Sequence, residues 1–426
     1  MQNATLWRAL LGVEKTVVED IEFDEGSELL VAHVRPRAGA RAQRRCGRCE
    51  RRSPAYDRGQ GRRRWRALDL GTVQVWLEAE APRVACREHG PTVAAVPWAR
   101  HGAGHTRIFD EQVAWLATQC SKSAVTELMR IAWRTVGAII TRVWADAEQL
   151  HDRYAGLRRI GIDEISYKRG YKYLTVVVDH DTGRLVWAAA GKDKTTLNGF
   201  FDLLGEQRCA QITHVSADGA DWISAVVATR CANAVRCADP FHVVKWATEA
   251  LDVVRREAWN NAKGRRLTPS QIQAREGGTG HAAALKSSRF ALWKNPENLT
   301  VRQQAKLAWI AKTDPRLHRA YLLKEGLRLV FQLDHSEAPE ALEIWIGWAR
   351  RCRIPAFVLL QKRIVKHKAS ILAAIEHGLS NGRIESVNTK IRLITRIAFG
   401  FRSPQALIAL AMLNLGGHRP TLPGRA

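Results

Sequence analysis

Short apolar runs alternate with amphipathic stretches in the central part of the chain, and this alternation most narrows the folds available to it. The patterns predict strands at 157–165, 173–179 and 184–190, a helix at 195–206, a strand at 212–216, a helix near 221–229 and a strand at 234–237. The first strand ends in acid at Asp163, and Asp218 follows directly after the fourth. The sequence therefore indicates an α/β domain with acidic residues at strand ends.

The order of these elements is that of a ribonuclease H-like domain. In that fold the first and fourth strands lie side by side, so Asp163 and Asp218 would meet at one edge of a mixed sheet. A third acid, Glu385, follows Ser380-Asn-Gly, a helix-start signal, and falls in the first turns of an amphipathic helix. Because residues 246–375 are mostly helical in pattern, we expect an all-α insertion to interrupt this α/β core.

Two pairs of metal-binding residue types occur near the N-terminus. Cys46 and Cys49 form a C-x-x-C pair, and Cys86 and His89 form a C-x-x-H pair further along the chain. Each pair can hold one metal from a tight turn, and four sulfur and nitrogen ligands complete a tetrahedral structural Zn²⁺ site. We therefore expect a zinc-ribbon-like module. The alternatives are unrelated surface cysteines with a chance histidine, or a redox-active cysteine pair.

The charge of the chain favours a polyanionic partner. Its 426 residues include 66 Lys and Arg against 42 Asp and Glu, a formal charge of +24. Between positions 35 and 66, thirteen arginines accompany two acids, which leaves +11 in that segment alone. Nucleic acid is the usual partner of such a protein. With no apolar run long enough to span a membrane, no signal-peptide pattern and scattered remaining cysteines, we expect a cytoplasmic, nucleoid-associated protein without membrane contact.

Residues 110–148 predict three helices, separated by short breaks near 120 and at 130–133. A short helix, a turn and a longer helix is the layout of a helix-turn-helix, whose last helix enters the major groove. Arg134, Thr135 and Arg142 on this last helix are the candidates for contacts with phosphates or bases. An ordinary helical hairpin that links two domains would have the same helix spacing.

Four motifs together resemble bacterial insertion-sequence transposases of the DDE type. They are GIDEIS, SADG, ADPFHVVKW and SNG-x-x-E-x-x-N-x-x-I, in this order along the chain. The whole chain is similar to the family called ISL-three. That resemblance implies a zinc module, a helix-turn-helix and a ribonuclease H-like catalytic domain with a helical insertion. It places the catalytic triad on Asp163, Asp218 and Glu385, and a D-x-x-H motif on Asp239 and His242. Many relatives have a fourth cysteine where this chain has His89.

The resemblance also defines the expected segments. They are a zinc-binding, DNA-binding module at 1–100, the helix-turn-helix at 105–150, the first part of the catalytic core at 155–245, the helical insertion at 246–375, and C-terminal core helices carrying the third acid at 376–426.

The implied reaction is metal-dependent DNA cleavage followed by strand transfer. Three carboxylates suffice to hold two Mg²⁺ or Mn²⁺ ions, which prefer oxygen ligands. In this interpretation Asp239, His242 and Asn388 are auxiliary residues, and Lys390 and Arg392 are expected to contact the DNA backbone. The substrates would be terminal inverted repeats and target DNA, bound by a homodimer that pairs two ends.

Each acid also has a plain structural interpretation. Asp163 neighbours Glu164, and adjacent strand residues point to opposite faces, so periodicity alone does not choose between them. Asp218 before a glycine is a common turn residue, Glu385 is a favourable first-turn helix acid, and D-x-x-H can be a helix cap followed by a core histidine. Two further functions remain open at this point: a domesticated DNA-binding protein without catalysis, and a ribonuclease H-like nuclease without strand transfer.

Overall fold

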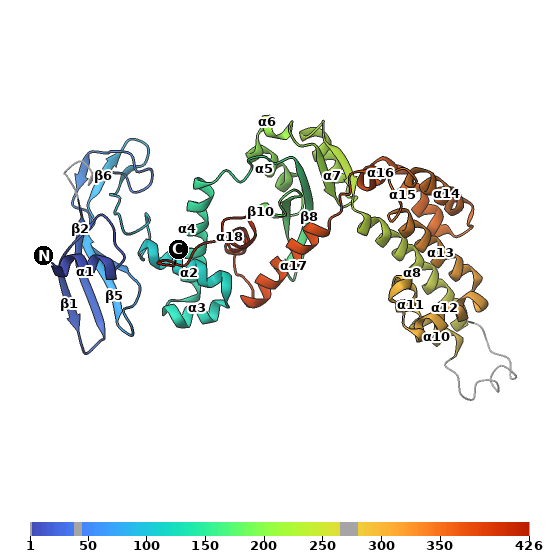
Figure 1. Ribbon diagram of the computed structural model, residues 1–426, viewed down its shortest axis with the longest axis horizontal. Coiled ribbons are helices and arrows are strands. Elements are labelled where there is room, and N and C mark those ends of the chain that lie inside the picture. Colours follow the sequence, from blue (N-terminus) through green and yellow to red (C-terminus); the bar gives the residue numbers. More distant parts are fainter. Residues whose placement is uncertain (1, 38–44, 265–279, 426) are drawn as a thin grey trace. The chain divides into compact units, whose positions relative to one another are not determined.

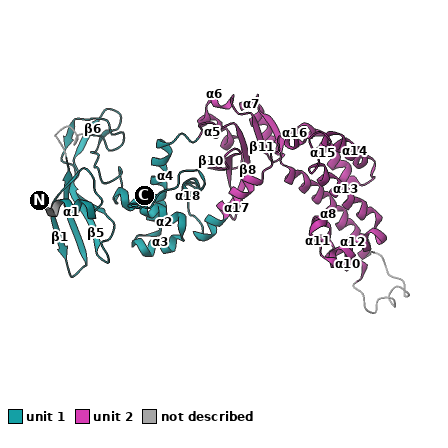
Figure 2. Cartoon of the chain, in the orientation of Figure 1, with its two compact units in different colours: residues 1–153, 393–426 teal, residues 154–392 magenta. Residues whose placement is uncertain are grey.

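The computed structural model describes residues 2–37, 45–264 and 280–425, which form two compact units. Unit 1 comprises residues 1–153 and 393–426, and unit 2 comprises residues 154–392 (Figure 2). Among the described residues no helix is long and apolar enough to cross a membrane.

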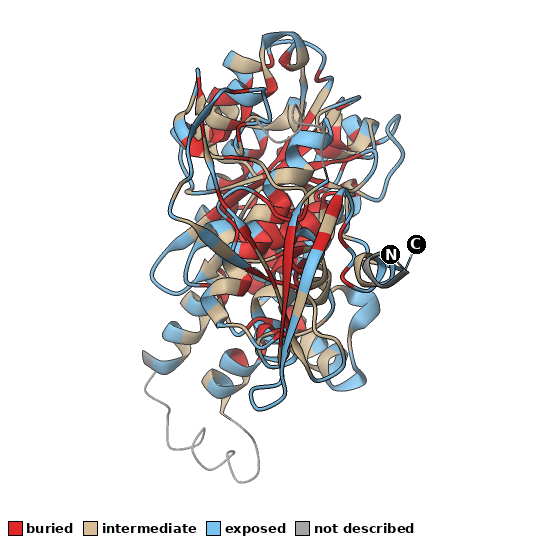
Figure 3. Cartoon of the chain, turned by 90° about the vertical axis from the view of Figure 1, so that its left-hand side faces the viewer, coloured by how far each residue is buried: buried red, intermediate tan, exposed pale blue. Residues whose placement is uncertain are grey.

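Unit 1 begins with helix α1 (Gln2–Leu10) and two small sheets. The first sheet has the order β1-β2-β5-β4, made of β1 (Thr16–Asp24), β2 (Leu29–Pro36), β5 (Gln74–Glu80) and β4 (Arg62–Arg66). The second sheet has the order β3-β6-β7, made of β3 (Ala55–Asp57), β6 (Arg83–Cys86) and β7 (Gly90–Val93). Leu77 on β5 and Trp65 on β4 are buried in the core of the first sheet, and the Trp65 ring packs edge-on against Trp98. In Figure 3 buried residues are red.

The three helices predicted at 110–148 are confirmed as α2 (Arg107–Gln119), α3 (Lys122–Met129) and α4 (Trp133–Leu150). Thr106 caps α2 and Ser121 caps α3, each by accepting a backbone hydrogen bond in the first turn. Arg130 ends α3 in the left-handed region, with φ 51°, and so turns the chain into α4.

The C-terminal helix α18 (Pro404–Leu415) packs against α2 and α4. Its buried side chains include Leu407, Leu410 and Leu413. Phe401 lies just before this helix, and the Lys122 ammonium is 4.3 Å from the centroid of its ring. Of the expected segment 376–426, residues up to 392 lie in unit 2 and residues from 393 lie in unit 1. Because α18 is apolar on nearly all sides, its sequence does not indicate which elements pack against it.

Unit 2 contains a mixed five-stranded sheet with the order β10-β9-β8-β11-β12 (Figure 1). Its strands are β8 (Arg159–Lys168), β9 (Lys172–Asp179), β10 (Leu185–Ala190), β11 (His214–Ala217) and β12 (Val235–Ala238). The five predicted strands are confirmed, and so is the predicted pairing of the first with the fourth. The expectation that the first strand ends in acid is wrong, because β8 continues to Lys168 and Asp163 lies within it. β8 pairs antiparallel with β9 and parallel with β11, with Ile162 opposite Ala217. Asp163 and Asp218 each follow one of these paired residues, so they lie at the same edge of the sheet.

Helices α5 (Lys194–Leu204), α6 (Glu206–Cys209) and α7 (Asp221–Arg230) pack with this sheet. Phe200 and Phe201 of α5 are fully buried, together with Ile160 of β8 and Val177 of β9. β8 and β9 are rich in Ile and Val, as expected for central strands. This core also includes residues of β11, so it holds both β8, which carries Asp163, and β11, which Asp218 follows.

Every described element between β12 and residue 381 is helical. These elements are α8 (Pro240–Gly264), α10 (His281–Ser287), α11 (Arg289–Trp293), the 3-10 helix η1 (Pro296–Asn298), α12 (Val301–Thr313), α13 (Pro315–Val330), α14 (Ala338–Arg351), α15 (Pro355–Lys366) and α16 (Lys368–Glu376). They share one apolar core, in which Trp345 is buried and donates its indole N–H to the carbonyl of Leu323. Helix α17 (Gly382–Ile397) then returns to the sheet.

Candidate active site

Asp163 lies in the middle of β8 with its carboxylate largely buried. Its Oδ1 accepts a hydrogen bond from the backbone N–H of Glu164 at 2.7 Å. Burial raises the pKa of Asp163 to about 6, and the neighbouring Asp218 and Glu164 act in the same direction. Glu164 instead pairs with Lys192 at 3.1 Å. Asp163 is thus a buried acid in an environment that favours a nearby cation.

Asp218 follows β11 in a turn, and its side chain is 43% exposed. The next residue must be glycine, because a Cβ on Gly219 would lie 2.5 Å from the ring of Trp246. The Arg363 guanidinium of α15 covers the same Trp246 ring at 3.6 Å from its centroid. Gly219 of the SADG motif and Trp246 of the ADPFHVVKW motif therefore pack closely together beside Asp218.

Helix α17 packs directly on β8. The side-chain amide of Asn388 donates to Oδ2 of Asp163 at 2.7 Å. A Cβ on Gly161 would lie 2.2 Å from Cδ1 of Ile384, so only glycine permits this approach. Glu385 is exposed and lies three residues before Asn388, on the neighbouring position of the same helix surface. The third acid is therefore carried by a helix that contacts the strand of the first.

Among the described residues, one group of Cys and His side chains has all its potential metal-ligand atoms within 4.8 Å of one another. The three acids do not form such a group. Asp163, Asp218 and Glu385 come from one sheet edge and its covering helix, but their carboxylates are spread more widely. The donor set, three carboxylates with one of them buried, suits a hard divalent cation.

Asp239 and His242 form a tight pair at the start of α8. Nδ1 of His242 lies 2.6 Å from Oδ2 of the buried Asp239, and Nε2 of His242 lies 4.0 Å from Oδ2 of Asp218. The Asp239 hydrogen bond, opposed by burial, raises the pKa of His242. The second carboxylate oxygen of Asp239 accepts from the backbone N–H of Asn381 at 3.2 Å. Asp239 thus orients His242 toward Asp218 and at the same time anchors the start of α17.

A buried polar chain at this edge was not predicted from the sequence. Nε2 of His180 lies 2.6 Å from the Ser216 hydroxyl, which in turn donates to Oδ1 of Asn381 at 2.6 Å. Burial, with the nearby Arg383 and Arg159, lowers the pKa of His180 to about 4, so it is neutral near pH 7. Ser216 and Asn381 belong to the SADG and SNG motifs, so the sequence pointed to these two residues. No motif in the sequence pointed to His180.

Lys390 and Arg392 are exposed on α17. Neither has a described hydrogen bond or ion pair with the acidic residues. Their predicted contact with the DNA backbone stays a prediction.

The predicted zinc ligands meet at one point in unit 1. Cys46, Cys49, Cys86 and His89 have their ligand atoms within 4.8 Å of one another. The Sγ atoms of Cys49 and Cys86 are 3.7 Å apart, and Nδ1 of His89 is 3.8 Å from Sγ of Cys46 and 3.6 Å from Sγ of Cys86. A tetrahedron with Zn–S bonds of about 2.3 Å has S–S edges of about 3.8 Å, so the four residues fit Zn²⁺.

The backbone supports the same assignment. The N–H of Arg48 points at Sγ of Cys46 at 3.4 Å, as in a metal-binding knuckle. Backbone hydrogen bonds from His89 and Glu88 lower the pKa of Cys86 to about 6. This thiol is therefore largely deprotonated at neutral pH, the form that binds a metal.

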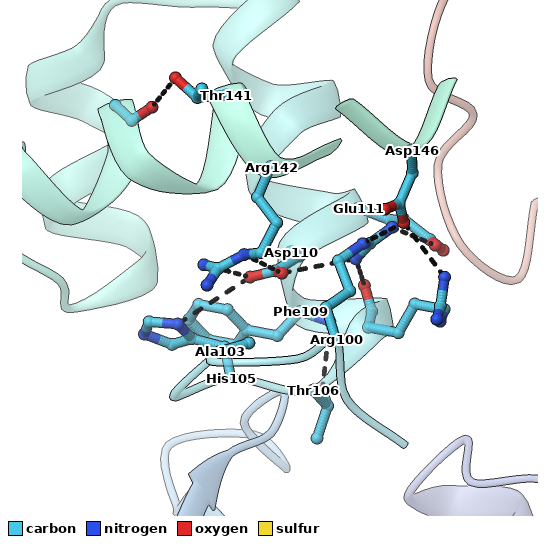
Figure 4. Close-up of polar contacts among 12 residues, drawn as sticks. Arg100, Ala103, His105, Thr106, Phe109, Asp110, Glu111, Thr141, Arg142 and Asp146 are labelled. Atoms are coloured by element: carbon cyan, nitrogen blue, oxygen red, sulfur yellow. Dashed lines mark hydrogen bonds and ion pairs between the residues drawn. The ribbon is translucent and has the colours of Figure 1, made fainter. Parts of the chain in front are cut away.

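An ion-pair cluster joins α2, α4 and the segment before α2 in unit 1 (Figure 4). Asp110 on α2 is fully buried, and Arg100 and Arg142 reach its carboxylate from two sides at 3.4 Å and 3.0 Å. Burial raises the pKa of Asp110 to about 6, while both guanidinium groups lower it. The charge of Arg142 thus neutralises a buried acid, and its predicted contact with DNA stays a prediction. Arg134 is exposed and Thr135 half-buried at the start of α4, so both stay candidates.

Three family models match the chain in succession. A zinc-finger model of the transposases of IS204, IS1001, IS1096 and IS1165 matches residues 42–89. A model of the helix-turn-helix domain of transposase family ISL3 matches residues 94–144. A transposase model of the ISL3 DDE type matches residues 160–411, more than half of the chain.

Curated relatives agree with these matches. The chain is 66% identical to the transposase for insertion sequence element IS1557 of Mycobacterium tuberculosis, over all of this chain and 98% of the relative. The same values hold in two strains, CDC 1551 and H37Rv. It is 25% identical to the transposase for insertion sequence element IS1001 of Bordetella parapertussis, over 95% of this chain and 96% of the relative.

Proposed function

The chain belongs to the ISL3 family of insertion-sequence transposases, and from this premise we propose that Asp163, Asp218 and Glu385 form its catalytic DDE triad. The observation that carries the proposal is the hydrogen bond from Asn388 to Asp163. It joins the helix that bears Glu385 to the strand that bears the first acid. The register of β8 with β11 puts Asp218 beside them.

The core has a ribonuclease H-like fold in this proposal. The sheet order, with the first strand between the second and the fourth, supports it. The helices from α8 to α16 then form the insertion between the second and third acids. Arg363, on α15, contacts the Trp246 ring beside Asp218. The insertion thus supports the turn that carries the second acid.

Asp163, Asp218 and Glu385 would together hold two Mg²⁺ or Mn²⁺ ions. Divalent ions bound there would activate the attacking oxygen and stabilise the leaving oxygen of an in-line phosphoryl transfer. Water is the first attacking group and the freed 3′-OH the second.

The remaining residues position this centre. Asn388 holds one oxygen of Asp163, so the carboxylate keeps one orientation while its other lone pairs face the site. Asp239 fixes His242 through Nδ1, which leaves Nε2 directed toward Asp218 and the DNA phosphate. Lys390 and Arg392, exposed on the same helix as Glu385, are proposed to contact the DNA backbone.

Unit 1 supplies the binding of double-stranded DNA in this account. The zinc module and the helix-turn-helix bind the terminal inverted repeats, with Arg134 and Thr135 at the start of the recognition helix. Because transposition joins two element ends to one target, we propose a homodimer in the DNA complex. With chromosomal DNA as its substrate, the protein is expected to work in the bacterial cytoplasm, at the nucleoid.

Cleavage of DNA that carries the element's own ends tests the proposal. Wild type and Asp218→Asn are compared in Mg²⁺ and in Mn²⁺ at matched DNA occupancy, with Asp221→Asn as the control. Asp221 is an exposed acid three residues away and pairs with Lys366. We expect cleavage by wild type and Asp221→Asn, and none by Asp218→Asn.

The other outcomes have definite meanings. Cleavage by Asp218→Asn at the wild-type rate would remove Asp218 from the triad. Binding without cleavage by all three proteins would favour a domesticated DNA-binding protein. Cleavage without joining of the 3′ end to target DNA would favour a nuclease.

A further inference from the structure

The hairpin between β8 and β9 projects beyond the sheet edge that carries the acids. β11 ends at Ala217, opposite Ile162, whereas β8 continues to Lys168 and pairs there with Lys172 of β9. Lys168 is five residues beyond Asp163, which is about 17 Å along a strand. The tip of this hairpin, residues 168–172, therefore lies outside the sheet on the side of the proposed active site.

The hairpin tip carries only positive charge. The segment from Ser166 to Tyr173 reads SYKRGYKY and contains no acidic residue. Lys168, Arg169 and Lys172 are all exposed. β10 ends at the same edge, and Lys192, which follows it, is 48% exposed although paired with Glu164. A polyanion that enters this edge would meet several cations at once.

Tyr171 at the tip combines two unfavourable features. Its exposed fraction is 90%, the highest among the exposed large apolar side chains of the described residues. Its backbone φ is 59°, directly after Gly170 at 83°. Gly or Asn usually occupies such a left-handed position, and a tyrosine is strained there. A strained, fully exposed aromatic residue on a basic tip is costly for folding and suggests a role in binding.

We propose that this hairpin tip is a DNA-binding element, in which Tyr171 stacks on a base while Lys168, Arg169 and Lys172 contact the adjacent phosphates. The distance from Asp163 corresponds to about five nucleotide steps of 3.4 Å from the scissile phosphate. Aromatic side chains beside a basic backbone contact are the usual platform for an unstacked base. This inference rests on the proposed active site, because that site brings DNA to this edge.

Fluorescence of 2-aminopurine tests the stacking contact. The probe is a duplex of the terminal 40 or so base pairs of the element, with a single 2-aminopurine placed in turn at each of the ten positions around the scissile phosphate. Binding is measured in Ca²⁺, so no cleavage is needed. Wild type and Tyr171→Phe should change the fluorescence at about the fifth position on one side, whereas Tyr171→Ala should not.

Affinity and its salt dependence supply a second readout. Loss of one stacking contact should weaken binding by Tyr171→Ala roughly tenfold, with Tyr171→Phe close to wild type. The triple variant Lys168→Ala/Arg169→Ala/Lys172→Ala should reduce the slope of log K against log salt by about 2 to 3. The tip is exposed, so each variant is expected to fold, and circular dichroism checks this.

Two results would overturn the proposal. One is an identical fluorescence profile for wild type and Tyr171→Ala, and the other is an unchanged salt slope in the triple variant. Both readouts are binding measurements, so they stay informative if the proposed triad fails. A failed triad abolishes the effect of Asp218→Asn on cleavage but leaves the 2-aminopurine signal in Ca²⁺.

Discussion

The side-chain amide of Asn388 donates a hydrogen bond to the carboxylate of Asp163 over 2.7 Å, although 225 positions separate the two residues. This contact joins α17 to the central strand of the sheet and so brings the segment of Glu385 to the segment of Asp163. The close approach of Ile384 to Gly161 lies one turn earlier on the same helix. Together they form the long-range connection on which the proposed triad depends.

Substitution of Asn388 tests this connection. Asn388→Ala removes the donor to Oδ2 of Asp163 and leaves the backbone hydrogen bond to Oδ1, which should cost about 1–3 kcal/mol of unfolding free energy. If Asn388 positions a metal ligand, the Mn²⁺ concentration for half-maximal cleavage should also rise. Thr389→Ala, at the exposed next position, is the control. Lower stability with an unchanged Mn²⁺ requirement would reduce Asn388 to a purely structural residue.

His180 should make the stability of unit 2 pH-dependent. Its pKa is about 4 in the folded protein and about 6.5 when unfolded. Between about pH 4 and 6.5 the unfolded state binds a proton at His180 that the folded state does not bind. The contribution of neutral His180 to the unfolding free energy is therefore complete above pH 6.5 and is lost as the pH falls toward 4. Between pH 7.5 and 5 the loss should reach about 2 kcal/mol.

Urea unfolding of wild type and His180→Gln at the two pH values measures this loss. The glutamine variant should lose less stability on acidification, because its side chain does not titrate. An equal loss in both proteins would show that His180 is not the titrating group.

Two arginines of α4 should separate folding from DNA binding. Arg142→Ala removes a partner of the buried Asp110 and should lower the unfolding free energy by about 1–3 kcal/mol. Arg134→Ala changes an exposed side chain and should instead weaken binding to the terminal repeat. Thermal unfolding and fluorescence anisotropy with labelled repeat DNA measure the two effects. The opposite pattern, with Arg134 needed for folding and Arg142 for binding alone, would contradict the assignment.

Zinc removal should unfold the N-terminal module. The cluster of Cys46, Cys49, Cys86 and His89 predicts one Zn²⁺ per chain, measurable by atomic absorption. Cys86→Ser should lose this zinc and expose the module to limited proteolysis. Cys120→Ser, which changes a cysteine outside the cluster, should keep it. Full zinc content in Cys86→Ser would exclude Cys86 as a ligand.

Local patterns made much of this structure predictable. Short apolar runs rich in Ile or Val marked β8 and β9, and the two-residue spacing of the cysteine and histidine pairs marked the zinc ligands. The neighbouring positions of β8 and β11 followed from the order of elements. These features depend on residues close together in sequence or on a rule of chain topology.

Long-range polar contacts were not predictable in this way. The bond between Ser216 and Asn381 spans 165 positions, and no periodicity links them. Arg134 is exposed on α4 and Arg142 pairs with the buried Asp110, and nothing in the sequence separated these two arginines. Similarly, α18 is apolar on nearly all sides and gave no indication that it packs with α2 and α4.

The most direct test asks whether the triad residues hold the ions. Asp218→Cys and Glu385→Cys replace an oxygen ligand with sulfur, which Mg²⁺ binds poorly and Mn²⁺ accepts more readily. Cleavage of element-end DNA is measured in each metal, with Asp218→Ala and Glu385→Ala as controls. The account predicts that the cysteine variants cleave in Mn²⁺ but not in Mg²⁺, and that the alanine variants cleave in neither. Cleavage by the alanine variants in Mg²⁺ at the wild-type rate would contradict it.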